Sequence, residues 1–183
     1  MPEAVRKLTT KEILSQNLAT NTPELLKNTK IILHNIRSMY NVGSVFRNAD
    51  AFGIESIHLS GYTPIPPRDE ISKTAIGAEK HVPWVQHATF SEIHQQFHRQ
   101  EYLFIGIEQT NVSSSLIDFK PKNAANNKFC LVFGNEVTGI DQEVIPFIDQ
   151  FVYIPQFGYK HSLNISVTTG IVLYALLEKS ANR

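Results

Sequence analysis

The sequence predicts an α/β protein in which helices flank a mainly parallel β-sheet. Short apolar runs rich in β-branched and aromatic residues recur along the chain, and polar turns or helix-like segments separate them. This alternation is typical of parallel sheets, whose strands are buried on both faces. The chain has 183 residues, 42% of them hydrophobic and 19% charged, which is enough for one domain with its own core.

The first strand of this sheet is expected at residues 30–36. Residues 1–29 precede it and are predicted to form an accessory arm, in which Thr10 and Glu12 introduce a short helix. A helix is predicted at 42–52, ending at Gly53 because glycine suits a helix C-terminus. A strand at 56–59, a loop at 61–67 stiffened by prolines and a short helix at 71–77 follow.

The second half of the chain continues the alternation. A strand at 82–86 contains Pro83 and should lie near a sheet edge, and the capping-box spacing of Thr89 and Glu92 starts a helix that reaches about residue 100. Three more buried strands are predicted at 102–107, 129–133 and 151–154. The last helix, 163–177, is expected to be capped by Ser162. Because it is apolar all round from residue 170, it should be buried on two sides.

Charge and composition narrow the classes of function. The 17 basic and 17 acidic residues balance, so the whole molecule has no field that would indicate a polyanionic partner, although residues 1–37 hold six basic and three acidic residues. No apolar run is long enough for a membrane span, and no signal sequence opens the chain, so we expect a cytoplasmic protein without membrane contacts. The single Cys130 cannot form an internal disulfide.

Several familiar motifs can be rejected. Residues 134–139 have the glycine spacing of a P-loop, but Ile140 and Asp141 stand where Lys and Ser or Thr are required. None of the nine glycines forms the Gly-x-Gly pair of a dinucleotide fold. His94 and His98 lie one helical turn apart without a third ligand, which indicates a solvated helix face and no metal site.

Three polar turns, each directly after a predicted strand, remain as the candidate site. They are residues 41–47 (NVGSVFR), 134–140 (GNEVTGI) and 155–164 (PQFGYKHSLN). The carboxyl ends of parallel strands meet at one edge of a sheet, where such folds bind their ligands. We therefore expect the turns to share a cleft that contains Asn41, Arg47, Glu136, Ser162 and Asn164.

In order and wording, these turns resemble the three motifs of SpoU or TrmH-type RNA methyltransferases of the SPOUT superfamily. The matching segments are 35–54 (NIRSMYNVGSVFRNADAFGI), 131–140 (LVFGNEVTGI) and 154–167 (IPQFGYKHSLNISV). Residues 74–84 (TAIGAEKHVPW) also resemble a segment found in part of this family. The resemblance covers about residues 30–178, and three ordered motifs are more specific than any one of them.

The resemblance implies a SPOUT methyltransferase domain at residues 30–183, with a deep C-terminal trefoil knot. It also implies S-adenosylmethionine as cofactor and a homodimer formed through the knot-bearing helices. The implied reaction is methyl transfer to the 2′-hydroxyl of an RNA ribose. We expect no counterpart of the separate RNA-binding domain of larger members, and we therefore expect residues 1–29 to serve as the substitute contact surface. We favour tRNA over ribosomal RNA as the substrate.

The resemblance also assigns roles to individual residues. Arg47 matches the catalytic arginine, either as the base itself or as an anchor for an adjacent phosphate. Asn41 would position the reacting groups beside it, and Asn164 would orient the arginine by a hydrogen bond. Glu136 would either pair with Arg47 or hold neighbouring backbone amides. Ser162 would touch the reacting site or the partner subunit as well as cap its helix.

The cofactor, in turn, would be held mainly by backbone groups. The positions that match are Gly134, Ile154, Phe157, Ser162 and Leu163. Two other functions stay open beside the ribose methyltransferase. One is a catalytically silent knotted RNA-binding dimer, against which the intact polar motif residues argue. The other is an enzyme that methylates a base nitrogen.

Overall fold

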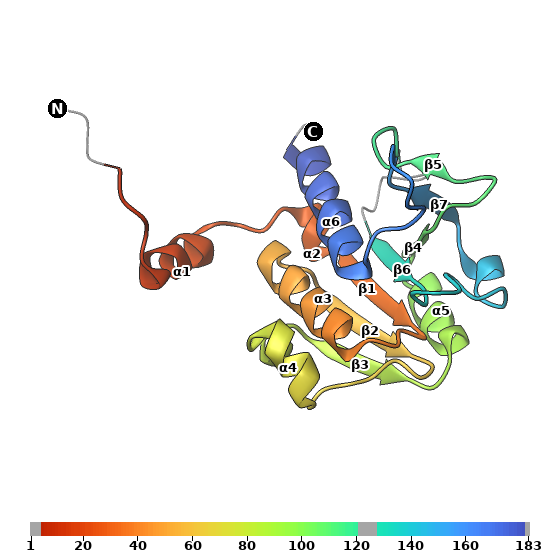
Figure 1. Ribbon diagram of the computed structural model, residues 1–183, viewed down its shortest axis with the longest axis horizontal. Helices are drawn as coiled ribbons and strands as arrows, with labels where there is room; N and C mark the ends of the chain where they lie inside the picture. Colours follow the sequence, from red (N-terminus) through yellow and green to blue (C-terminus); the bar gives the residue numbers. More distant parts are fainter. Residues whose placement is uncertain (1–4, 121–127, 182–183) are drawn as a thin grey trace.

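The computed structural model describes residues 5–120 and 128–181, and within them seven strands form one sheet (Figure 1). The strand order is β3-β2-β1-β6-β4-β7-β5, and every neighbouring pair is parallel. The bounds are β1 (Thr29–His34), β2 (Ser56–Ser60), β3 (Trp84–His87), β4 (Leu103–Ile107), β5 (Ser114–Ser115), β6 (Phe129–Phe133) and β7 (Gln150–Tyr153). The predicted mainly parallel α/β class is confirmed.

Helices cover both faces of the sheet. One face is covered by α2 (Glu24–Lys27), α3 (Met39–Phe52), α4 (Asp69–Ala75) and α6 (Ile165–Ala181), and the other by α5 (Phe90–His98). Two short 3-10 helices, Ala78–Lys80 and Ile145–Phe147, connect elements. The central helices α3 and α6 pack against each other over β1 and β6 (Figure 1).

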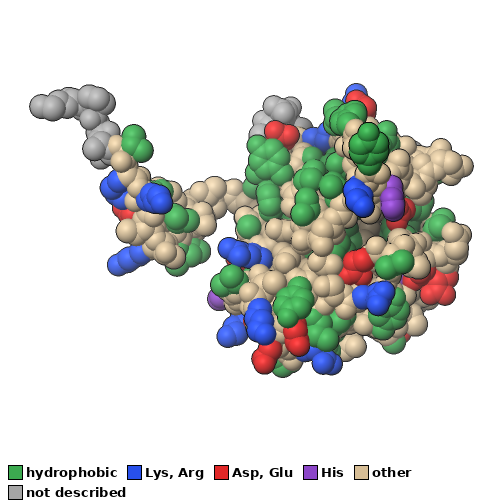
Figure 2. All heavy atoms as spheres, in the orientation of Figure 1, with side chains coloured by type: hydrophobic (Ala, Val, Ile, Leu, Met, Phe, Trp, Pro, Cys, Tyr) green, Lys and Arg blue, Asp and Glu red, His purple; other side chains and the backbone are tan. Residues whose placement is uncertain are grey.

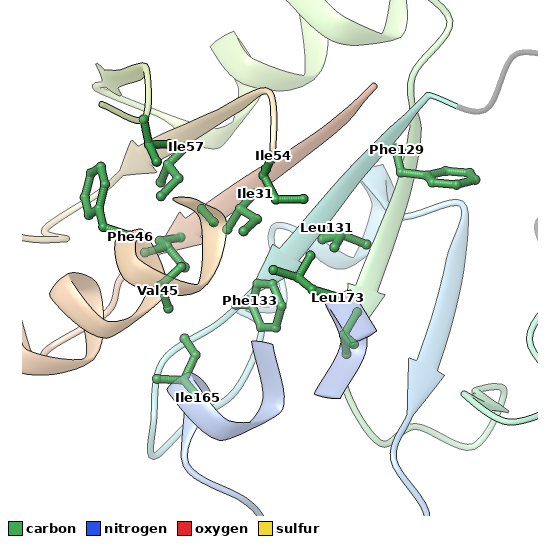
Figure 3. Packing of buried hydrophobic residues seen from close by; sticks show 14 of the residues in the cluster. Ile31, Val45, Phe46, Ile54, Ile57, Phe129, Leu131, Phe133, Ile165 and Leu173 are labelled. Atoms are coloured by element: carbon green, nitrogen blue, oxygen red, sulfur yellow. The ribbon is translucent and has the colours of Figure 1, made fainter. Parts of the chain in front are cut away.

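Strand side chains alternate between two apolar clusters. On β1, Ile31 and Leu33 face the α3 and α6 side, whereas Ile32 faces the α5 side. Figure 3 shows Ile31 beside Ile54, with residues of α3 on one side of it and residues of β6 and α6 on the other, all in the same cluster. A strand buried on both faces is mostly apolar, and the apolar runs of β1, β4 and β6 made these strands recognisable from the sequence.

Several boundaries differ from the predicted ones. The helix expected at 42–52 begins earlier, at Met39, because the Ser38 side chain accepts a hydrogen bond from the Asn41 amide and caps it. It ends at Gly53 as predicted, with φ of 64°. The two-residue β5, which the sequence did not indicate, forms the sheet edge opposite β3.

The arm has two parts with different environments. Helix α1 (Thr10–Ala19) has no buried residue and lies away from the sheet (Figure 1), and its side chains stand clear of the body in Figure 2. Its capping box uses Thr9 with Glu12 rather than Thr10. In contrast, Leu25 and Leu26 of α2 are buried in the main core. Within residues 1–29, therefore, α1 stands apart from the body whereas α2 belongs to it.

A buried polar chain crosses the α5 side of the sheet. Lys30 pairs with Glu55, the Ser56 hydroxyl is hydrogen-bonded to His58 Nε2 at 3.0 Å, and His58 Nδ1 to His87 Nε2 at 2.9 Å. Burial, with smaller contributions from His87 and Lys30, lowers the pKa of His58 to about 3. His58 is therefore neutral in the folded protein at any pH above that value.

Acidification from about pH 7.5 to pH 5 should lower the free energy of unfolding by about 2 kcal/mol through His58 alone. An unfolded histidine binds a proton near its ordinary pKa of 6.5, whereas the folded one does so near about 3, so stability is lost as the pH falls. Urea unfolding at both pH values measures this loss. His58→Gln should remove that part of the pH dependence, and the exposed His81→Gln should keep it. An unchanged slope in His58→Gln would contradict the prediction.

Candidate active site

The turns after β1 and β6 are joined by one carboxylate. Glu136 accepts hydrogen bonds from the backbone amides of Arg37 and Ser38, at 2.9 and 3.1 Å, and from Asn41 Nδ2 at 2.9 Å. Of the two roles left open for Glu136, the structure therefore has the second, since the carboxylate holds backbone amides. Glu136 forms no hydrogen bond or ion pair with Arg47 among the interactions of the described residues.

These donors set the ionisation of Glu136. Burial would raise the pKa of its carboxyl, but the hydrogen bonds from the Arg37 amide, the Asn41 side chain and further amides outweigh burial and leave the pKa below its ordinary value. A carboxylate held ionised by several donors is a weak proton acceptor. Glu136 thus acts as an anchor of the site rather than as its base.

The third turn joins the other two through Asn164. Its Nδ2 donates to Asn41 Oδ1 at 3.1 Å, and its Oδ1 accepts from the Ser166 amide at 2.8 Å at the start of α6. The expected hydrogen bond from Asn164 to Arg47 is therefore wrong, because the Asn164 amide group is used by Asn41 and Ser166. The predicted cap at Ser162 is also wrong: α6 begins at Ile165, so Asn164 occupies the capping position.

Arg47 is placed apart from this cluster. Its side chain is exposed on α3, and it forms no hydrogen bond or ion pair with the residues that the structure describes. Asn41, Glu136 and Asn164 are brought together as the sequence predicted, and Ser162 lies in the adjoining pocket. Among the catalytic candidates, Arg47 alone neither belongs to this cluster nor lines either of the two pockets found among the described residues.

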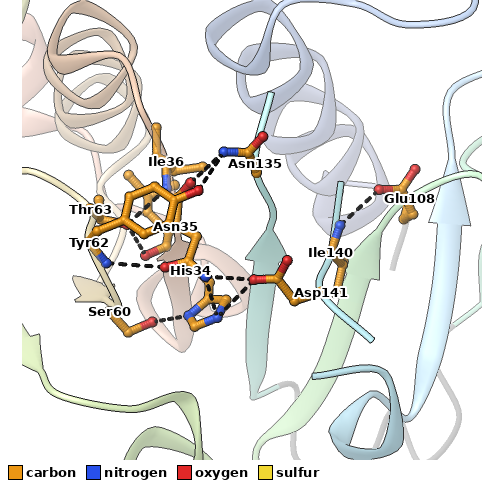
Figure 4. Close-up of polar contacts among 11 residues, drawn as sticks. His34, Asn35, Ile36, Ser60, Tyr62, Thr63, Glu108, Asn135, Ile140 and Asp141 are labelled. Atoms are coloured by element: carbon orange, nitrogen blue, oxygen red, sulfur yellow. Dashed lines mark hydrogen bonds and ion pairs between the residues drawn. The ribbon is translucent and has the colours of Figure 1, made fainter. Parts of the chain in front are cut away.

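A second polar network behind the turns was missed by sequence reasoning (Figure 4). Asn135 Nδ2 donates to the Asn35 carbonyl oxygen and to the Tyr62 hydroxyl, both at 2.9 Å, and Asn135 Oδ1 accepts from the amides of Val137 and Thr138. Asn35 has a positive φ of 55°, a conformation that asparagine tolerates. Asparagines within two residues of the ends of two strands were a readable signal of such turn chemistry.

A pocket of about 690 Å³ opens between the turns after β4, β6 and β7. Its volume lies in the range typical of small-molecule sites. The predicted cofactor positions Gly134, Ile154, Ser162 and Leu163 line it. Phe157 does not, because its side chain points into solvent and is 97% exposed.

A second hollow of about 470 Å³ adjoins the first. Both are lined by Glu136, Val137 and Asn164, so the hydrogen-bonded cluster stands where the two meet. The second hollow is completed by Arg37, Ser38 and Asn41. This arrangement suits two reactants, one in each hollow, that meet beside the cluster.

The comparisons with known proteins agree with this geometry. A profile described as the SpoU rRNA Methylase family matches residues 28–174. The chain belongs to this family. The resemblance of the three motifs is thereby confirmed.

Curated relatives of this SpoU family member include RNA methyltransferases. It is 27% identical to the tRNA (guanosine(18)-2′-O)-methyltransferase of Escherichia coli K12 over 169 residues, which cover 92% of this chain and 69% of the relative. It is 26% identical to a putative TrmH family tRNA/rRNA methyltransferase of Staphylococcus haemolyticus, over 82% of this chain and 59% of the relative.

Solved structures of the family share the fold. The SpoU methyltransferase AviRb of Streptomyces viridochromogenes has a TM-score of 0.77 at 20% identity, over 85% of this chain and 61% of that chain. An AdoMet-bound rRNA methyltransferase of Sinorhizobium meliloti has a TM-score of 0.74 at 26% identity, over 83% and 56%. This chain thus spans only 61% and 56% of those two structures.

S-adenosylmethionine is the cofactor, as predicted, and when bound it supplies a reactive methyl group. The residues of the larger pocket fit it. Apolar walls from Ile107, Ile154 and Leu163 suit a nucleoside ring, and backbone groups of residues 134–140 and the Glu108 carboxylate supply polar partners. The methyl group would be presented where the two hollows meet.

The histidine pair on α5 is packed rather than solvated. His94 and His98 stack with ring centroids 5.0 Å apart, and His94 also contacts Phe104 and Phe147. The predicted solvated face is therefore wrong for His94, which packs at the edge of the apolar cluster under α5.

In residues 5–120 and 128–181, no cluster of three or more His, Cys, Asp or Glu side chains is arranged to hold a metal. Among these same residues no helix has the length and apolar character to cross a membrane.

Proposed function

We propose that this SpoU family member transfers a methyl group from S-adenosylmethionine to the 2′-hydroxyl of a ribose in tRNA. The observation that carries the proposal is the cluster of Asn41, Glu136 and Asn164 at the junction of the two hollows. The larger hollow accommodates the cofactor, which leaves the smaller one for the acceptor ribose. The tRNA 2′-O-methyltransferase among the relatives supports this choice of acceptor.

The residues of the smaller hollow would position the acceptor. Glu136 fixes the turn that carries Arg37 and Ser38, and Asn41 is fixed between Glu136 and Asn164. Rigid placement of this kind lowers the entropic cost of bringing the hydroxyl oxygen in line with the methyl group. Because Glu136 is a weak base, proton removal is left to another group, and Arg47 remains the proposed one, directly or through a bound phosphate.

Identification of the methylated nucleoside tests this function. Purified protein is incubated with labelled S-adenosylmethionine and with separate pools of unmodified tRNA and rRNA, and the product nucleosides are identified by mass spectrometry. We expect a 2′-O-methylated nucleoside from tRNA. Label in rRNA alone would show that rRNA, not tRNA, is the substrate. A base-methylated nucleoside would show that the enzyme methylates a base nitrogen and not the ribose. Cofactor binding without transfer to either pool would favour the silent RNA-binding dimer.

A deep trefoil knot is proposed with this function. The family resemblance is its main support. The path of the chain agrees with it: α6 follows β7 near one sheet edge and yet packs on α2 and α3 over the sheet centre (Figure 1). The turn at 155–164, which joins β7 to α6, also lines the cofactor pocket.

A homodimer through α6 is proposed as well. The helix buries Leu173 and Leu176 against the core, and the described residues cover only this side of it. Its other side exposes Val167, Ile171 and Tyr174, with exposed fractions of 50%, 38% and 54%. These positions follow the i, i+4, i+7 spacing of one helix face, which predicts an interface.

Ile171→Glu is expected to convert the dimer to a monomer, because a charge buried in an apolar interface without a partner costs several kcal/mol, more than such contacts supply. Size-exclusion chromatography with light scattering measures the mass. Val112→Glu, which places the same charge on another exposed apolar residue, should remain dimeric. A monomeric wild type, or a dimeric Ile171→Glu variant, would overturn the proposed interface.

A further inference from the structure

A single carboxylate in the cofactor pocket is not explained by the motifs. Glu108 directly follows β4 and lines the pocket of about 690 Å³. Its Oε1 accepts a hydrogen bond from the Gln109 amide at 2.9 Å, and its Oε2 accepts one from the Ile140 amide at 3.2 Å (Figure 4). No ion pair of Glu108 occurs within the described residues, so its negative charge has no cationic partner there.

The carboxylate is held in place on the loop side. A Cβ atom added to Gly139 would lie 2.2 Å from Glu108 Oε2, so the carboxylate lies directly against the Gly139 backbone. Each carboxylate oxygen can accept two hydrogen bonds, and each already accepts one backbone amide. One acceptor position per oxygen therefore remains on a side chain that needs no reorganisation to bind a ligand.

The chemistry of the cofactor limits which of its groups could bind to the Glu108 carboxylate. S-adenosylmethionine carries three kinds of hydrogen-bond donor: the adenine amino group, the vicinal hydroxyls of its own ribose, and the ammonium group of its methionine part. The vicinal hydroxyls carry their donors on two neighbouring carbon atoms, one for each carboxylate oxygen, whereas the donors of the amino and ammonium groups share a single nitrogen. An acidic side chain beside the carboxyl end of a parallel strand recognises ribose hydroxyls in the same way in dinucleotide-binding folds.

The position of Glu108 agrees with this choice. The methyl group must reach the junction of the hollows, beside Glu136 and Asn164, at the ends of β6 and of the turn after β7. β4 pairs with β6 in the sheet, so Glu108 lies one strand away from the turn that carries Glu136. The cofactor ribose is joined to the sulfonium through a single carbon, which places its hydroxyls near the reacting end rather than far along the pocket.

We propose that Glu108 binds the two ribose hydroxyls of S-adenosylmethionine and so makes the site selective for a ribonucleoside cofactor. The alternative is that Glu108 only latches the loop at 139–140 through the Ile140 amide. The two roles predict different effects of substituting Glu108. If Glu108 binds the hydroxyls, the substitution weakens only ligands that carry them. If Glu108 only holds the loop, the substitution weakens every ligand equally. The proposal holds whichever RNA is methylated.

Calorimetric titration of the full chain with three ligands separates the roles. They are S-adenosylhomocysteine, its 2′,3′-dideoxy analogue, and 5′-methylthioadenosine, which keeps the hydroxyls but lacks the ammonium group. In Glu108→Gln the amide oxygen can still accept from Ile140, but the negative charge is gone. Glu143→Gln removes the same charge from an exposed position that does not line the pocket.

Glu108→Gln should weaken S-adenosylhomocysteine and 5′-methylthioadenosine by about tenfold each, and the dideoxy analogue by less than about twofold. Glu143→Gln should change none of the three. Equal weakening of all three ligands would show a latch, and weakening that spares only 5′-methylthioadenosine would show an ammonium contact; either result overturns the proposal. The wild type alone is a second test that needs no variant: it must bind S-adenosylhomocysteine about tenfold tighter than the dideoxy analogue, and equal binding would overturn the assignment.

Discussion

Arg47→Ala should reduce methyl transfer by about 100-fold or more, with cofactor affinity unchanged within about twofold. The side chain is exposed on α3 and has no hydrogen bond or ion pair with any residue that the structure describes. Its removal should therefore change the free energy of unfolding by less than about 0.5 kcal/mol. A loss of turnover in a fully folded, cofactor-binding variant can then be attributed to the reaction itself. Single-turnover transfer assays, calorimetry and thermal unfolding measure the three quantities.

The role of Arg47 is resolved by a second substitution. Arg47→Lys keeps the positive charge but not the planar fork that binds a phosphate through two parallel hydrogen bonds. Partial recovery of transfer, with a raised KM for RNA, indicates an anchor for phosphate, whereas no recovery of kcat indicates a direct part in proton removal. Arg99→Ala, at the exposed C-terminal end of α5, is the control and should behave as wild type. Unimpaired transfer by Arg47→Ala would remove Arg47 from the mechanism.

Gly134→Ala should weaken cofactor binding by at least about 100-fold and destabilise the protein by about 1–3 kcal/mol. A Cβ atom at this position would lie 2.3 Å from the carbonyl carbon and oxygen of Gly139 and 2.4 Å from the Ile140 nitrogen. These are backbone atoms of the turn that lines the pocket, so the turn must open to admit the methyl group. Opening would also break the backbone pair between Asn135 and Gly139.

Gly158→Ala is the matched control for this substitution. Gly158 lies in the third polar turn, and a Cβ atom there would meet no other atom within 4 Å. Calorimetry with S-adenosylmethionine and urea unfolding should give wild-type values for this variant. If Gly134→Ala also binds the cofactor normally, the turn at 134–140 is more compliant than its contacts indicate, and Gly134 has no part in shaping the pocket.

The strands and most helices followed from local patterns. Apolar runs predicted β1, β4 and β6, because strands covered on both faces carry mostly apolar residues in their middle. The buried His58 in the middle of β2 is an exception, and its ring is hydrogen-bonded to Ser56 and His87. Errors were concentrated at helix starts and in β5. Ser38, Thr9 and Asn164 were each chosen as caps over neighbouring Ser, Thr or Asn residues that have the same hydrogen-bonding capacity.

The positions of the functional turns were also readable, since polar turns after parallel strands must gather at one sheet edge. Which side chains of these turns bond to one another could not be read from the sequence. Glu136 could have met Arg47 or backbone amides, and Asn164 could have met Arg47 or Asn41; these alternatives are chemically equivalent in a sequence. Glu108, which has no motif of its own, became a candidate only when the fold placed it in the pocket.

Periodicity, composition and turn chemistry thus decided the fold class, the family and the identity of the three turns, because these depend on residues close together in the chain. Tertiary structure alone decided which donor meets which acceptor, since Asn41 and Asn164 are separated by 123 residues and Arg37 and Glu136 by 99. It also decided which face of α6 the described residues leave exposed. The apolar residues on all sides of this helix predict that both faces are buried, but only the packing of α2 and α3 determines which face the chain covers itself.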